Sequence, residues 1–360
     1  MASTGLNFAN LTPDNGAVKD LRKLIFRAVL GAEQVGRICN VLPKQRHGEK
    51  AGYVGEFGLI GRASSKCNPE FESNLLTTEE DTWDIKEWEV AEKICYADLE
   101  GTVAQTAMKT GTDIADLTGT DYIDYILMPR LELAVRKMIL RFAWFGDKEA
   151  KNVAEGGVLK AGVSPSRFNV TDGFWKRIFA LVAKDASRHT TIAANAETTW
   201  AKQKAAFRAA GVATGIMDDL ISDASLVLRE QPNGVIYITQ AFKDALDRDI
   251  KANNKGSEMQ WTALFDGVMS SKYNGIEVVV VPFFDEIIQN YEATANAGQY
   301  NKPFRAIYTI KDNLLVGTES ESEISSIEIW FNRDEQVNKI HAKDKLGTLI
   351  AQGDLVQVAY

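Results

Sequence analysis

The sequence predicts an α+β fold, and three features predict that class. An apolar stripe at helical spacing occupies the middle of the chain, from Ile123 to Phe145. Two buried apolar runs, beginning at Gly234 and Gly275, each lead directly into a helical pattern. After residue 300 the chain contains short strand patterns separated by turn residues. Helices and strands mixed in this way favour packed layers of both kinds.

The composition is that of an ordinary globular protein and argues against several functional classes. The 360 residues carry 41 Lys and Arg against 49 Asp and Glu, a net charge of −8, so no basic footprint for nucleic acid is present overall. Cys39, Cys67 and Cys95 include no CxxC pair, and they predict neither a disulfide framework nor a zinc site. No secretory signal and no membrane-length apolar run occurs. We expect an intracellular protein with no membrane contact.

The first elements are an arm, a helix and a glycine-rich hairpin. Residues 1–15 are polar and predict an extended arm, and the apolar spacing from Val18 to Val29 predicts a helix. Beyond it, glycines recur at every third position from Gly52 to Gly61, which is not the spacing of a phosphate-binding loop. A long hairpin of this kind cannot bury both of its faces alone. We therefore expect four apolar residues in it to contact another subunit: Tyr53, Phe57, Leu59 and Ile60.

The longest predicted helix spans residues 121–145, with Thr120 or Asp121 as its cap and Gly146 as its end. Its apolar stripe consists of Leu127, Leu131, Ala134, Met138, Phe142 and Phe145. Pro129 lies inside, so the helix bends there or begins its regular part nearby. Further on, Gly156 and Gly157 lie in a polar link. We predict that Pro129, Gly156 and Gly157 act as hinges.

The remaining elements follow in a regular order. Residues 172–185 predict a helix, and residues 198–224 predict helices interrupted by glycines. Residues 234–250 and 275–288 each predict a buried strand followed by a helix, with Pro282 ending the second strand. Short strands are predicted at residues 305–310, 313–319, 326–332 and 354–360.

No motif for chemistry is present, so we predict no catalytic, cofactor-binding or metal-binding residues. The sequence lacks GxSxG, GxxxxGK[ST], HExxH and EF-hand patterns. His47, His189 and His341 lie far apart, and the acidic residues between Asp113 and Asp124 lack the calcium-loop spacing. An intracellular α/β enzyme whose site is assembled from scattered residues remains an alternative.

Taken in order, these elements resemble the major capsid protein of tailed bacteriophages, which has the HK-97-like fold. The resemblance assigns residues 1–36 to the N-terminal arm and helix, and residues 37–81 to the extended loop, or E-loop. Residues 82–160 form the peripheral domain with its spine helix, whose core is "MPRLELAVRKMILRFAWFGD". The resemblance likewise assigns residues 161–300 to the axial domain, and residues 301–360 to strands that return to the peripheral domain and to the C-terminal strands.

The resemblance implies a structural protein of the virion rather than an enzyme. Copies of the chain would form homo-pentamers and homo-hexamers, and these would build an icosahedral shell around double-stranded DNA without sequence-specific contact. Assembly would take place in the host bacterial cytoplasm. It would involve a separate scaffold protein, because no scaffolding extension precedes the arm, together with a portal and decoration proteins. An encapsulin-like nanocompartment shell and a tail protein are the related alternatives.

Overall fold

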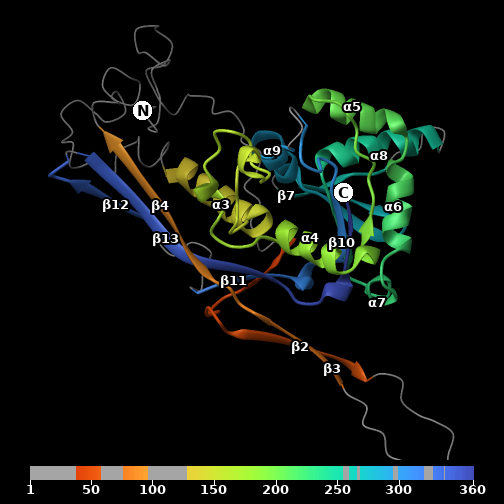
Figure 1. Cartoon of the computed structure of the whole chain (residues 1–360), viewed down its shortest axis with the longest axis horizontal. Helices are drawn as coiled ribbons and strands as arrows, with labels where there is room; N and C mark the ends of the chain where they lie inside the picture. The colour runs from red at the N-terminus through yellow and green to blue at the C-terminus, as the bar shows by residue number, and fades with distance from the viewer. Residues whose placement is uncertain are drawn as a thin grey trace, which may run out of the picture.

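The computed structural model describes residues 38–57, 76–95, 128–253, 259–265, 268–294, 299–319, 327–335 and 337–360. Figure 1 shows three regions: a sheet enclosed by helices, a long sheet beside helix α3, and a two-stranded ribbon that extends away from both. The predicted arm and first helix, residues 1–36, lie outside the described residues.

The region enclosed by helices, which we call the axial body, is built on a seven-stranded sheet with the order β5-β14-β10-β6-β9-β8-β7. Its strands are β5 (His189–Thr190), β6 (Gly234–Ile238), β7 (Thr262–Phe265), β8 (Val268–Tyr273), β9 (Ile276–Val280), β10 (Ala306–Ile310) and β14 (Val356–Ala359). The pairs β6–β9 and β5–β14 are parallel, and the other pairs are antiparallel.

Helices cover both faces of this sheet. Successive side chains of a strand therefore pack against helices on opposite faces. The helices are α4 (Phe174–Lys184), α5 (Trp200–Ala210), α6 (Ala213–Ser222), α7 (Leu226–Arg229), α8 (Gln240–Asn253) and α9 (Pro282–Tyr291). In β6, Ile236 and Ile238 pack into the core cluster that contains α5, α6 and α8. Val235 and Tyr237 pack into the other cluster, with α3, α4 and α9. Because both faces are buried, the strand is a continuous apolar run.

The local signals in this part of the sequence are confirmed. The strand β6 is followed by α8 and the strand β9 by α9, with Pro282 at the first position of α9, where a missing N–H costs nothing. Gly211 has a positive φ of 67° and separates α5 from α6, as expected for a glycine that ends a helix.

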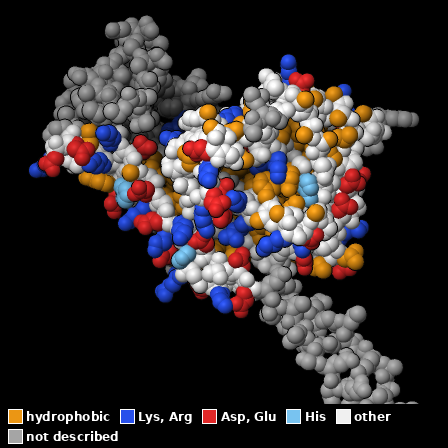
Figure 2. Space-filling model, in the orientation of Figure 1, with side chains coloured by type: hydrophobic (Ala, Val, Ile, Leu, Met, Phe, Trp, Pro, Cys, Tyr) orange, Lys and Arg blue, Asp and Glu red, His pale blue; other side chains and the backbone are white. Residues whose placement is uncertain are grey.

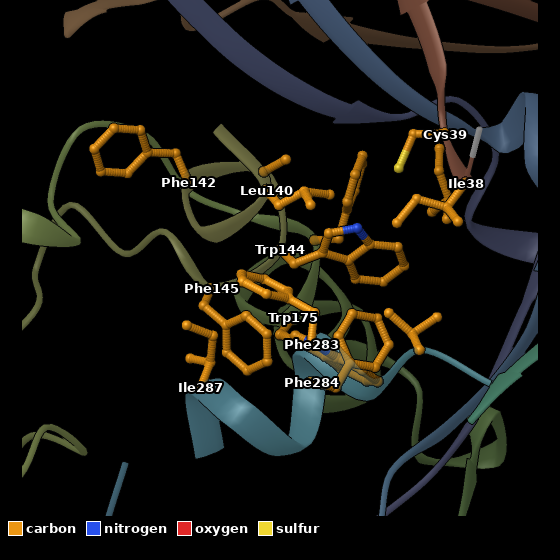
Figure 3. Close-up of a cluster of buried hydrophobic side chains, with 14 of the residues drawn as sticks. Ile38, Cys39, Leu140, Phe142, Trp144, Phe145, Trp175, Phe283, Phe284 and Ile287 are labelled. Atoms are coloured by element: carbon orange, nitrogen blue, oxygen red, sulfur yellow. The ribbon is translucent and has the colours of Figure 1, made fainter. Parts of the chain in front are cut away.

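Helix α3 (Met128–Phe145) carries one of the fully buried tryptophans of the core, Trp144. Trp144 contacts Phe174 and Phe284 with ring centroids 5.1 and 4.6 Å apart, and Figure 3 shows it among the side chains of α4 and α9. Gly146 comes directly after the last residue of α3. A side chain at this position would clash, because a Cβ would lie 2.3 Å from the Thr171 carbonyl oxygen. The predicted stripe is correct at Met138, Phe142 and Phe145, which are buried.

The stripe is wrong at Ala134, which is exposed, whereas its neighbour Val135 is buried. The last two turns of α3 are buried on nearly all sides, since α4, α9 and β13 surround them. A helix enclosed in this way is buried around most of its circumference. A single apolar stripe therefore does not identify all of its buried positions. Residues 121–127 of the predicted helix lie outside the described residues.

The second sheet, which we call the peripheral sheet, has five strands. They are β1 (Asn40–Leu42), β4 (Lys86–Cys95), β11 (Leu314–Thr318), β12 (Ile327–Asn332) and β13 (Val337–Ile350). The strand β13 has 14 residues and pairs with β4, β11 and β12, all antiparallel, and these long strands extend beyond the axial body (Figure 1).

The predicted boundary at residue 301 does not match the sheets. Within residues 301–360, β10 and β14 belong to the axial body, and only β11, β12 and β13 belong to the peripheral sheet. Within this segment the chain therefore crosses between the two sheets twice, after β10 and again after β13. Sequence patterns identify a strand but not its neighbours, so this division was not predictable from periodicity.

Candidate assembly surfaces

The ribbon consists of two strands that pair with each other and with no other strand of the described part. Strands β2 (Lys50–Phe57) and β3 (Leu76–Thr82) form a separate antiparallel sheet, in which Lys50 pairs with Thr82 and Val54 with Thr78. The register then shifts before Phe57. Figure 1 shows the ribbon directed away from the helices. An isolated two-stranded hairpin is at best marginally stable in water, so this shape favours contact with another molecule.

The four predicted contact residues fall in or beside this ribbon. Tyr53 and Phe57 lie on β2, where their backbones pair with Glu79 and Leu76. Leu59 and Ile60 lie outside the described residues. The role of these residues as inter-subunit contacts stays a prediction.

The base of the ribbon is fixed by a buried tryptophan. Trp83 follows β3, is only 2% exposed and packs with Ile85 and Leu349 of β13. Its ring lies against Gly317 of β11, where an added Cβ would be 2.7 Å from the ring. The Trp83 amide donates to the Glu49 carbonyl and the Gly48 amide donates to the Trp83 carbonyl, both at 2.8 Å. The ribbon therefore begins at a rigid attachment to the peripheral sheet.

Charged side chains form a second attachment, which we call the polar joint (Asp81, Asp84, Lys148, Asp172 and Arg177). Arg177 of α4 donates to Thr348 Oγ1 at 3.1 Å and to Asp81 Oδ2 at 3.4 Å. Lys148 pairs with Asp84 and, at 3.5 Å, with Asp172. Figure 2 shows acidic and basic side chains interleaved where the ribbon meets the body.

The polar joint connects the ribbon base to α4, β13 and the residues after α3. Burial lowers the pKa of Arg177, and Asp81 and Asp172 oppose that shift, so the guanidinium remains a cation at neutral pH. Sequence reasoning did not find this cluster, because its members come from three separate segments and form no motif.

Two of the predicted hinge residues form a tight turn. Gly156 has a positive φ of 82°, and a Cβ on Gly157 would lie 2.0 Å from the Lys151 carbonyl oxygen. The flanking chain is hydrogen-bonded to the end of α9, with Lys160 donating to the Tyr291 carbonyl at 2.8 Å. The segment thus forms a hydrogen-bonded turn within the predicted polar link. Its action as a hinge stays a prediction.

Pro129, the third predicted hinge residue, lies in the first turn of the described part of α3. Its role as a hinge also stays a prediction.

One hollow of the described part contains a phenol beside a carboxylate. A hollow of about 820 Å³ between α6, α8 and β8 contains Tyr273, whose hydroxyl donates to Asp218 at 2.8 Å. Burial, with the neighbouring Asp218, raises the pKa of Tyr273, so this phenol stays protonated at neutral pH. Among the described residues, no three His, Cys, Asp or Glu side chains are grouped as metal ligands. No helix in those ranges is long and apolar enough to span a bilayer.

Solved structures with the same architecture are found among phage and capsid particles. The chain superposes on a chain of Gordonia phage Cozz with a TM-score of 0.54 at 8% identity, covering 100% of this chain and 96% of that one. For the capsid of an empty GTA particle the TM-score is 0.52 at 11% identity, covering 99% of both chains. For Mycobacterium phage Bobi it is 0.51 at 9% identity, covering 97% and 98%.

No protein-family model matches the chain, and no curated protein matches it in sequence. The structural likeness, which extends over essentially the whole of both chains, establishes the fold. The chain has the α+β, HK-97-like fold of phage capsid proteins, as the order of its elements predicted.

Proposed function

We propose that the chain is a major capsid protein, a structural subunit that assembles with copies of itself into the icosahedral shell of a tailed phage. The observation that carries the proposal is the end-to-end likeness to a subunit of an assembled capsid, which includes 99% of both chains. A likeness of that extent involves every described region rather than one shared sheet.

The shape of the subunit supports a role in assembly. The ribbon extends beyond the core that holds the rest of the chain together, and the peripheral sheet extends in another direction (Figure 1). Elements that bury little within their own chain are suited to burying surface against a neighbour. Many such modest contacts, repeated around a closed shell, stabilise it through multivalency.

The proposal extends to partners and location. Copies of the chain form pentamers and hexamers, with a separate scaffold protein, a portal and decoration proteins as further components of the virion. The shell assembles in the host bacterial cytoplasm and encloses double-stranded DNA. A net charge of −8 suits a wall that does not hold the genome by counterion release. The subunit performs no catalysis in this role.

The test is negative-stain electron microscopy of the expressed chain, beside multi-angle light scattering of the same sample. Closed particles or rings are the expected result. A chain that remains monomeric at every concentration, both alone and together with a separate scaffold protein, contradicts the proposal. Tubes instead of closed shells indicate a tail protein.

A further inference from the structure

We infer that neighbouring subunits join within a ring through a head-to-tail contact, in which the α7 tip of one axial body docks on the outer face of α5 of the next. This inference rests on the proposed function and specifies the partner, a second copy of this chain. It is carried by exposed apolar side chains, by opposite charge on the two surfaces and by their positions on opposite flanks.

The α7 tip presents the two most exposed large apolar side chains of the described part. Leu226 is 72% exposed and Val227 is 53% exposed. Ser225 fixes the short helix, since its hydroxyl accepts from the Leu228 amide at 3.2 Å and donates to the Asp354 carbonyl at 2.6 Å. Two adjacent apolar side chains on a fixed support are typical of a contact surface.

The charges around the α7 tip are mainly negative. From Ala213 to Glu230 the chain carries four carboxylates and one cation, Arg229. Asp223 and Glu230 flank the apolar pair and are exposed. In Figure 2, hydrophobic and acidic side chains gather at the corner of the molecule over α7.

The outer face of α5 has the opposite character. The helix contains three cations and no carboxylate, and Lys202 and Arg208 are exposed on it. Within the described part of the chain, neither of these two side chains forms an ion pair, whereas Lys204 pairs with Asp244. The same face exposes Ala205 and Ala209, whose small side chains leave room for a partner's leucine and valine.

The two surfaces lie on opposite flanks of the axial body, at the end away from the peripheral sheet (Figure 1). A contact between different surfaces of identical subunits is heterologous, and it closes into a ring when the rotation is suitable. Opposite charge fixes the register of such a contact and disfavours pairing of like surfaces.

Charge reversal tests the contact. We expect Lys202→Glu with Arg208→Glu to reduce the yield of rings and particles about tenfold or more, because two negative surfaces then meet. Asp223→Lys with Glu230→Lys should have the same effect. The chain that carries all four changes restores opposite charge and should recover most of the yield.

Two controls exclude effects of net charge and of misfolding on the particle yield. Lys151→Glu with Lys184→Glu makes the same change in net charge at two exposed lysines outside both surfaces, and it should leave the yield unchanged. Circular dichroism and urea midpoints check that every variant folds, and particles are counted by electron microscopy at matched concentration.

The outcomes separate this contact from the proposed function. Wild-type rings or particles that persist in both reversed variants overturn this contact alone, as does failure of the fourfold variant to recover when it is folded. A wild-type chain that never assembles overturns the proposed function and the contact with it. Loss in each reversed variant, followed by recovery in the fourfold variant, establishes the α5–α7 contact.

Discussion

The axial body and the ribbon are stabilised in different ways. In the axial body, helices cover both faces of a seven-stranded sheet, and two large apolar clusters fill the layers between them. The ribbon is a two-stranded sheet attached by a three-residue apolar cluster around Trp83 and by the polar joint. One region is complete within the chain, and the other depends on its attachment and on what it touches.

This difference indicates that rigidity and adaptability are divided between the two regions. A sheet enclosed by helices holds its shape regardless of its neighbours, because its stability comes from burial inside the chain. A ribbon attached only at its base can adapt to a neighbour without disturbing that core, since locally stable units open independently. The predictions below test that independence, beginning with the largest effect.

The strongest test of the axial body is Arg305→Ala. Arg305 is fully buried and pairs with Glu292, and its Nε donates to the Lys302 carbonyl at 2.9 Å. Removing the guanidinium leaves a buried carboxylate without its cation, which costs about 3–5 kcal/mol. We expect the free energy of unfolding of the whole chain, measured in urea, to fall by that amount.

The control for Arg305 replaces both partners, as Arg305→Met with Glu292→Leu. Apolar side chains of similar size remove the unpaired charge, so the double variant should be clearly more stable than Arg305→Ala. Equal loss in both variants would show that hydrogen bonding to the loop, rather than the ion pair, stabilises this part of the core.

The ribbon attachment is tested by Trp83→Ala. The change removes the buried ring from the cluster with Ile85 and Leu349, and we expect it to cost about 3 kcal/mol of local stability. Amide hydrogen exchange in residues 50–57 and 76–82 should accelerate roughly 100-fold, while exchange in the axial body stays unchanged. Acceleration that includes β6 and β9 would mean that the two regions unfold together.

A pH dependence is expected from Asp285, which lies on α9 and accepts from the Gln240 and Ala241 amides at the start of α8. Burial raises the pKa of Asp285 from 3.8 to about 6, although these backbone hydrogen bonds oppose the shift. The neutral carboxyl thus contributes stability that is complete below pH 4 and is lost as the pH rises through 6.

We expect Asp285→Asn to remove this pH dependence. Between pH 4 and 7 the stability of the variant relative to the wild type should rise by roughly 1–3 kcal/mol, measured by urea unfolding at each pH. A change in the opposite direction would show that the ionised form, acting as the cap of α8, is the stabilising one.

Sequence periodicity predicted the elements of the axial body because each of them is decided by local chemistry. Pro282 begins α9, Gly211 separates α5 from α6, and apolar spacing marks α4 and α8. The same reasoning missed β13, since "VNKIHAKDKLGTLI" contains three lysines and lacks the apolar density of a buried strand. Only pairing with β4, β11 and β12 makes that segment a strand.

The ribbon attachment was not predictable for a related reason. Trp83 was visible in the sequence as one of seven scattered tryptophans, but its neighbour Gly317 is more than two hundred positions away. The polar joint likewise brings Asp81 beside Arg177. Contacts between distant segments follow from topology, and local patterns carry no information about them.

The smallest effect is expected at the ribbon itself, from Lys50→Ala. Lys50 pairs with Glu80 across β2 and β3 at 2.6 Å, and this partner raises the pKa of Lys50, yet both side chains are well exposed. Exposed ion pairs are screened by water and salt, so we expect no measurable change in the urea unfolding of the chain. A clear loss of stability would mean that the ribbon belongs to the same cooperative unit as the axial body, and the contrast between the two regions would then fail. An unchanged midpoint is the result that solvent screening of the Lys50–Glu80 pair predicts, and it contrasts with the large loss expected in Arg305→Ala, whose ion pair is buried.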